Sequence, residues 1–156
     1  MSNLKEMMAR HAQEGRVAWI GLRPARREAL IPMEAAELSV EAGLVGDHGR
    51  SLKRGVTLIQ AEHMPVIAAL SGAEVTPEIL RRNIVVSGIN HLALKDCEIS
   101  IGSARLEITA PCHPCSRMEE VLGHGGYSAV RGHGGVYARV ILSGRVRLGD
   151  VVTLGA

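Results

Sequence analysis

The chain is divided into short apolar segments, and this pattern limits its fold more than any other feature. Segments rich in Val, Ile and Leu recur along the sequence with Gly-containing turns between them. Short strands repeated at a spacing of roughly 8–12 residues are typical of barrels and sandwiches. The pattern disfavours a doubly wound parallel sheet, which needs long helices between its strands.

We therefore expect a mainly β fold with short helices, forming one domain over residues 1–156. The expected helices span 3–13, 61–70, 76–80 and 116–122, and loops rich in glycine are expected at 43–49 and 123–135. The expected strands span 16–22, 28–33, 37–40, 56–60, 83–87, 98–101, 105–110, 136–142, 145–148 and 151–154.

Composition excludes several classes of partner. Aromatic residues make up only 2% of the chain, and single-stranded nucleic acids bind by stacking on aromatic side chains. The formal net charge of +2 is too small to indicate a polyanion, so no nucleic-acid partner is expected. No apolar run approaches the ~18 residues of a membrane span, and residues 1–14 contain no apolar core of a signal peptide. We expect a cytoplasmic protein without a membrane partner.

The three cysteines are an odd number, which does not indicate a disulfide framework. Cys112 and Cys115 lie after an expected strand and before an expected helix. The free N–H groups and dipole of a helix N-terminus stabilise a thiolate, as do cations such as Arg117 and protonated His113. Cys115 is at the expected N-cap, so it is the better placed of the two cysteines.

Several kinds of chemistry are open to this pair. A thioredoxin-like redox pair has the same strand–CxxC–helix order, but the surrounding βαβ layout is missing. A zinc site could use Cys112, Cys115, His124 and His133, but their spacing matches no usual finger. A single thiolate that binds a soft metal or carries sulfur as a persulfide is the interpretation we favour.

Polar residues elsewhere indicate an anion site. Arg81 and Asn83 lie two residues apart at the start of an expected strand, so their side chains would share a face and a ligand. Asp47 and His48 follow a glycine turn, where an Asp serves to cap the turn, orient a His or hold an Arg. The glycines of 123–135 could bind phosphate through successive N–H groups, or form a flexible loop.

Six segments in register resemble the MOSC domain, a family named after the C-terminal domain of molybdenum cofactor sulfurases. They read Gly-Leu-Val-Gly-Asp-His at 43–48, Val-Thr-Leu-Ile at 56–59 with Glu62, Arg-Arg-Asn-Ile-Val-Val-Ser-Gly at 81–88, Pro-Cys-His-Pro-Cys at 111–115, Gly-Gly-Val-Tyr-Ala-Arg-Val at 134–140, and Gly-Arg-Val-Arg-Leu-Gly-Asp at 144–150. The resemblance runs in order from about residue 15 to residue 155.

The resemblance implies a MOSC-type β-barrel that binds the molybdenum cofactor, a molybdenum–pyranopterin, and not pyridoxal phosphate. It implies that Cys115 is the catalytic residue, as a direct molybdenum ligand or a sulfur carrier. It extends neither to the N-terminal barrel of amidoxime-reducing members nor to the aminotransferase-like domain of the sulfurases. The residues expected to bind the cofactor are Arg81, Asn83, Asp47, His48, Gly134, Gly135 and Arg139.

Two functions are compatible with this resemblance. The first is a small molybdenum-dependent reductase of N-hydroxylated compounds, which would need a separate electron-donor protein. The second is a transfer module that receives sulfur from a donor protein as a Cys115 persulfide and catalyses no redox reaction itself. Bound molybdenum and pterin would favour the first, and a sulfur adduct on Cys115 without metal would favour the second.

Overall fold

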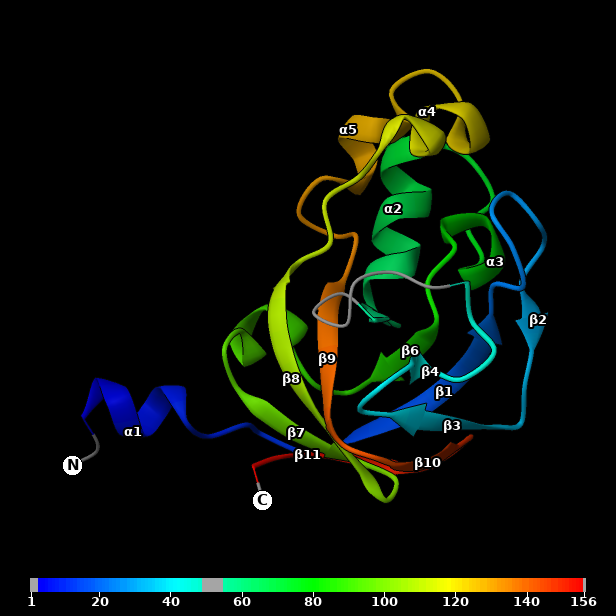
Figure 1. Ribbon diagram of the computed structural model, residues 1–156. Coiled ribbons are helices and arrows are strands. Elements are labelled where there is room, and N and C mark those ends of the chain that lie inside the picture. Colours follow the sequence, from blue (N-terminus) through cyan, green and yellow to red (C-terminus); the bar gives the residue numbers. More distant parts are fainter. Residues whose placement is uncertain (1–2, 49–54, 156) are drawn as a thin grey trace.

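One sheet curls until its outer strands meet. The computed structural model describes residues 3–48 and 55–155. Its barrel strands are β1 (Gly15–Leu22), β5 (Val56–Gln60), β6 (Ile84–Ser87), β7 (Glu98–Ile101), β8 (Ala104–Pro111), β9 (Val136–Leu142) and β11 (Val151–Leu154). They are hydrogen-bonded in the order β11-β7-β8-β9-β5-β6-β1, and pairing of β1 with β11 closes the barrel (Figure 1). The mainly β barrel predicted from the sequence is confirmed.

Smaller elements extend the barrel. β2 (Ile31–Pro32) pairs with the end of β1. A second sheet has the order β10-β3-β4 and consists of β10 (Gly144–Arg147), β3 (Ala35–Ser39) and β4 (Gly43–Leu44). Most neighbouring strands run antiparallel, but β5 and β6 run parallel because two helices connect them.

Alternation of apolar residues fills the barrel. Along β9, buried Val136, Ala138 and Val140 alternate with more exposed residues, which is the period-2 pattern of a strand with one face in the core. The main hydrophobic cluster collects such residues from all the barrel strands. Aliphatic side chains dominate it, as the scarcity of aromatic residues requires.

Four short helices cover the outer side of β5 and β6. They are α2 (His63–Ser71), α3 (Pro77–Leu80), α4 (Ser116–Leu122) and α5 (Gly126–Val130). A second cluster joins them to the sheet through Ile59, Ile67, Leu80, Val85, Met118, Leu122 and Val130. The 3₁₀ helix η2 (His91–Leu94) follows β6. α1 (Leu4–Met8) stands away from the barrel, and none of its residues is buried (Figure 1).

Four sequence predictions need correction. The helix expected at 3–13 ends at Met8, because only its Asn3–Glu6 capping box stabilises it and no face of it is buried. The strand expected at 28–33 shortens to Ile31–Pro32. The loop expected at 43–49, of which residue 49 lies outside the described residues, begins with the two-residue strand β4. The loop expected at 123–135 contains the helix α5.

The unexpected helix α5 has a local cause. The Glu119 carboxylate accepts hydrogen bonds from the main-chain N–H groups of Gly125 and Tyr127, at 3.0 Å each. These two bonds lower the pKa of Glu119 and satisfy donors at the start of α5. Gly126 lets α5 approach α4 closely, since a Cβ there would lie 2.6 Å from Leu122 Cβ and from the Met118 carbonyl oxygen.

Candidate functional site

A cleft of about 320 Å³ is lined by residues of α3, α4 and the loop that joins β1 to β2. Its lining is strongly cationic. Among the residues described, those that line it are Arg23, Arg26, Arg27, His48, Leu80, Arg81, Arg82, Cys115, Ser116, Arg117, Met118 and Glu120. Six of these are arginines and one is a glutamate, so the cleft is suited to a negatively charged ligand.

Cys115 is the nucleophilic group of this cleft. It is the N-cap residue of α4, but its side chain makes no capping hydrogen bond, and its thiol is exposed. Cys112 is 5% exposed, and its main-chain N–H donates to the Gly135 carbonyl at 2.8 Å. The structure therefore separates the two thiols by accessibility, with the predicted residue Cys115 on the cleft and Cys112 in the interior.

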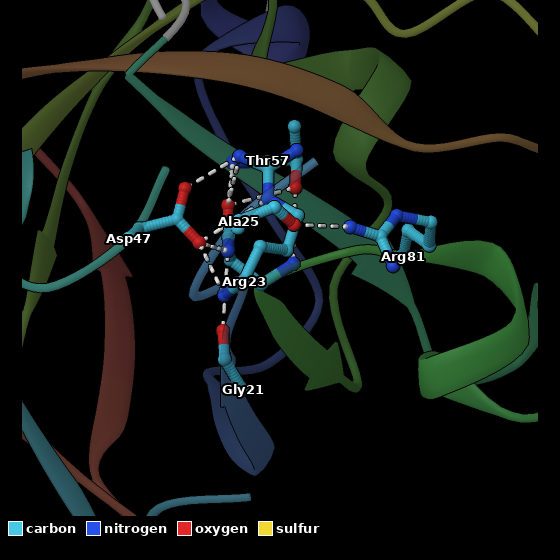
Figure 2. Close-up of polar contacts among 7 residues, drawn as sticks. Gly21, Arg23, Ala25, Asp47, Thr57 and Arg81 are labelled. Atoms are coloured by element: carbon cyan, nitrogen blue, oxygen red, sulfur yellow. Dashed lines mark hydrogen bonds and ion pairs between the residues drawn. The ribbon is translucent and has the colours of Figure 1, made fainter. Parts of the chain in front are cut away.

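Arg81 lines the cleft, as its predicted role in anion binding requires. It is the C-cap residue of α3 and adopts a left-handed conformation with φ of 57°. Its guanidinium donates to the main-chain carbonyls of Ala25 and Glu28, and the bond to Ala25 is drawn in Figure 2. Arg81 thereby anchors the loop that carries Arg26 and Arg27.

Asn83 is placed differently. β6 begins at Ile84, so the strand alternation expected to put Arg81 and Asn83 on one face does not apply. Asn83 is fully buried. Its Oδ1 accepts from the N–H and the hydroxyl of Thr57, at 3.1 and 3.0 Å. Its Nδ2 donates to the Gly21 carbonyl at 3.1 Å and to Asp47 Oδ1 at 2.9 Å.

Asp47 belongs to the same buried network (Figure 2). Its carboxylate forms a two-point ion pair with Arg23, with Oδ2 2.6 Å from Nη2 and Oδ1 3.2 Å from Nε. Oδ1 also accepts from the main-chain N–H of Arg23 at 2.7 Å. Asp47 therefore orients an arginine, which is one of the roles that the sequence left open for it.

Arg82 is buried, with 8% of its surface exposed. Its Nε donates to the Gly134 carbonyl at 2.7 Å and its Nη1 to the Leu80 carbonyl at 2.9 Å. A Cβ on Gly134 would lie 2.6 Å from the Cys112 carbonyl oxygen and 3.3 Å from Arg82 Nη2. Glycine at 134 thus allows the segment to pass between Arg82 and the cysteine segment.

The acidic residue of the cleft, Glu120, contacts two of its arginines. Its carboxylate lies 3.6 Å from the Arg27 guanidinium and 3.8 Å from that of Arg117. Arg27 and Glu120 are 60% and 52% exposed, so water screens this contact. The pair links the β1–β2 loop to α4.

Of the remaining predicted residues, one lines the cleft and two lie outside its lining. His48 lines the cleft, and its main-chain N–H donates to the Arg23 carbonyl at 2.6 Å. Gly135 has φ of +91°, and a Cβ there would collide with the Leu58 carbonyl. Arg139 lies on β9, outside the set of residues that lines the cleft, and pairs with Glu107 on β8 at 2.9 Å.

The alternatives considered for the cysteines do not gain support. Within residues 3–48 and 55–155, no three His, Cys, Asp or Glu side chains come together to bind a metal. This excludes a zinc site made of Cys112, Cys115, His124 and His133. The cysteines are free thiols, and the closed barrel has no thioredoxin-like layout.

Three histidines outside the cleft lie near one another. His63 and His133 meet edge to face with ring centroids 5.3 Å apart. His91 is 2% exposed, and neither of its ring nitrogens has a hydrogen-bond partner among the described residues. Burial, aided by the charge of His63, lowers the pKa of His91 to about 4.

No helix in the described part of the chain is long and apolar enough to cross a membrane.

Sequence reasoning did not assign Arg23, Arg26, Arg27 or Arg82 to the site. A signal for the first three was present, because Arg23-Pro24-Ala25-Arg26-Arg27 places three arginines around a proline at the end of a strand. Arg82 lies in the segment 81–88 that resembles the MOSC family, but the two-residue spacing of Arg81 and Asn83 led to the prediction of those two residues as the anion ligands.

The closed barrel, the helical cover and the cationic cleft beside a free cysteine define a small β-barrel domain with a thiol-containing anion cleft. Residues 45–153 match the model of the MOSC domain. The chain therefore belongs to the MOSC domain family. A search of curated proteins gave no match.

Solved structures share the fold. The YUAD protein from Bacillus subtilis superposes with a TM-score of 0.77 at 18% identity, over 90% of this chain and 94% of that one. YiiM from Escherichia coli gives 0.70 at 19% identity, over 90% of this chain and 70% of its own. YiiM from Geobacillus stearothermophilus gives 0.73 at 16% identity, over 91% and 75%. At these identities the likeness concerns the fold alone.

Proposed function

We propose that the cleft binds a molybdenum–pyranopterin cofactor and that the protein reduces N-hydroxylated compounds. The observation that carries the proposal is the meeting of six arginines and one exposed thiol in a single cleft. Guanidinium groups bind the phosphate that such a cofactor carries. A thiolate is a good ligand for a soft metal.

The described residues fit this cofactor better than a bare metal ion. A metal held by protein side chains alone needs several ligands close together, and the described residues form no such group. A single thiol, Cys115, is sufficient when the metal arrives with the sulfur ligands of its own cofactor. When bound, the cofactor would supply the two-electron reduction.

The residues of the cleft would bind the cofactor and orient it. The arginines of the cleft would hold the anionic end of the cofactor, and Cys115 would be the protein ligand of the metal. His48, which is among the residues that line the cleft, would deliver a proton. In the overall reaction the N–O bond of R–NHOH breaks, and two electrons and two protons give R–NH₂ and water. A separate electron-donor protein would provide the electrons.

The exposure of Cys115 supports a second candidate, a sulfur-transfer module. Because its thiol is accessible, the persulfide of a donor protein can reach it. Attack by Cys115 on the terminal sulfur would break the donor S–S bond and form a new one. The donor leaves as a thiol, and Cys115 becomes a persulfide without net oxidation.

Analysis of metal, pterin and sulfur distinguishes the two candidates. The protein is purified from a host that synthesises the cofactor, and the Cys115→Ser variant is prepared in parallel. Stoichiometric molybdenum and pterin in the wild type, with loss of molybdenum from C115S, would support the reductase. A mass increase of one sulfur atom on Cys115 without metal would support the transfer module. Absence of both would contradict both candidates.

A further inference from the structure

The two buried arginines of the cleft differ in how their charge is neutralised. Arg23 and Arg82 are 3% and 8% exposed. The Asp47 carboxylate pairs with Arg23. Among the described residues no carboxylate pairs with Arg82, whose Nε and Nη1 donate only to the carbonyls of Gly134 and Leu80. Its Nη2 makes no hydrogen bond to any described residue.

An uncompensated buried charge is costly. Removing an ion from water carries a penalty of several kcal/mol, which a counter-ion normally offsets. Main-chain carbonyls hold a guanidinium in place but do not neutralise it. Since Arg82 lines the cleft, an anion in the cleft can take the position that Asp47 takes for Arg23.

We infer that Arg82 is the anchor of an oxyanion subsite and that its ligand is a phosphate group. This inference rests on the proposed function in one respect, namely that the natural ligand of the cleft carries a phosphate group. Phosphate is favoured over a carboxylate because six arginines and one glutamate line the cleft. Even with Arg23 neutralised by Asp47, the formal positive charge of this lining exceeds the single charge of a carboxylate. Two oxygens of a phosphate also match the fork of a guanidinium.

The fold holds the Arg82 guanidinium rigidly. Bonds from Nε and Nη1 tie it to two separate segments, at Gly134 and at the end of α3. Gly134 is in turn packed against the Cys112 carbonyl, so the subsite is connected to the segment that carries Cys115. Gly134, which the sequence suggested as a phosphate contact, is here a positioning residue for Arg82.

The test measures binding of inorganic phosphate to the metal-free protein. Arg82→Met is compared with the wild type and with Arg145→Met, a control that removes an exposed arginine of β10 outside the residues lining the cleft. Dissociation constants come from NMR titration at constant ionic strength. Loss of a charge-assisted bond of about 1.5–3 kcal/mol corresponds to a roughly 10- to 100-fold weaker affinity. R82M should show this loss, and R145M should bind like the wild type.

Two further measurements secure the assignment. Arg82→Lys keeps the positive charge but loses the two-pronged guanidinium, so R82K should bind phosphate more weakly than the wild type and more tightly than a folded R82M. If R82M folds poorly, the comparison of R82K with the wild type still tests the subsite. Phosphate should also slow alkylation of Cys115 in the wild type and in R145M, but not in R82M. Equal affinity of R82M and wild type, or tighter binding of acetate than of phosphate, would overturn the subsite. Failure of the protein to bind pterin or metal would overturn the proposed function and leave the phosphate result standing.

Discussion

Asp47 and Arg23 form an ion pair that is almost completely shielded from water. The closest atoms, Oδ2 and Nη2, are 2.6 Å apart, and the side chains are 4% and 3% exposed. Asn83 donates a further bond to the same carboxylate. The carboxylate therefore fixes an arginine of the cleft through contacts that no ligand needs to displace.

Replacing Asp47 should destabilise the protein strongly. Asp47→Ala leaves the Arg23 charge buried without its partner, and breaking a buried pair in this way costs about 3–5 kcal/mol. Urea denaturation should show a fall of this size in the free energy of unfolding. The double variant D47A/R23M should recover part of the loss because no isolated charge remains buried. A single variant as stable as the wild type would contradict the role given to the pair.

The two cysteines of the 111–115 segment should differ in reactivity. A brief treatment of the native protein with iodoacetamide should modify Cys115, which is exposed, and spare Cys112, which is 5% exposed. Peptide mass spectrometry identifies the modified residue. C115S should lose function, whereas C112S should keep most of it. Equal loss in a folded C112S protein would favour a role for both thiols.

The buried histidine should make the protein sensitive to acid. Burial lowers the pKa of His91 from its ordinary value of 6.5 to about 4 in the folded state, so the unfolded chain binds the proton first as the pH falls. Its contribution to stability is complete above pH 6.5 and is lost as the pH falls toward 4. The loss is on the order of 3 kcal/mol.

Urea denaturation at pH 7 and pH 4 measures this effect. His91→Leu should flatten the difference between the two pH values, because a leucine takes up no proton. His113→Gln, which removes an exposed histidine, serves as the control and should keep the wild-type difference. An unchanged difference in H91L would assign the acid sensitivity to other groups.

Glu120 should act against anion binding. It is the acidic group of the cleft and lies near Arg27 and Arg117. Glu120→Gln should tighten phosphate binding severalfold, because an exposed charge contact is worth about 0–1 kcal/mol. Its melting temperature should stay close to that of the wild type. Weaker phosphate binding in E120Q would show that Glu120 organises the arginines instead of competing for them.

The sequence predicted the barrel strands well because the alternation of a strand and the residues of a turn are properties of neighbouring positions in the chain. The alternation in β9 and the turn at Gly102-Ser103 between β7 and β8 can be read from neighbouring residues. The helix α5 could not be read in this way, since a carboxylate from the preceding helix, Glu119, caps it.

The candidate site was predicted in part. Cys115 and Arg81 carried local signals and both line the cleft. The different surroundings of Arg23 and Arg82 depend on Asp47 and Gly134, which are 24 and 52 residues distant in sequence. Whether an arginine keeps an unneutralised charge depends on such distant contacts, so local pattern could not distinguish Arg82 from its neighbours.

Closure of the barrel by β1 and β11 has a consequence for synthesis. Arg16 pairs with Val151 and Gly15 with Val152, so the ring of strands stays open until the ribosome has released nearly the whole of this sequence. Until then β1 and β7 each lack the neighbour that β11 provides, and unpaired edges recruit strands from other chains. Nascent chains that stall before Val151 should therefore depend on chaperones, although every residue that lines the cleft has already been made.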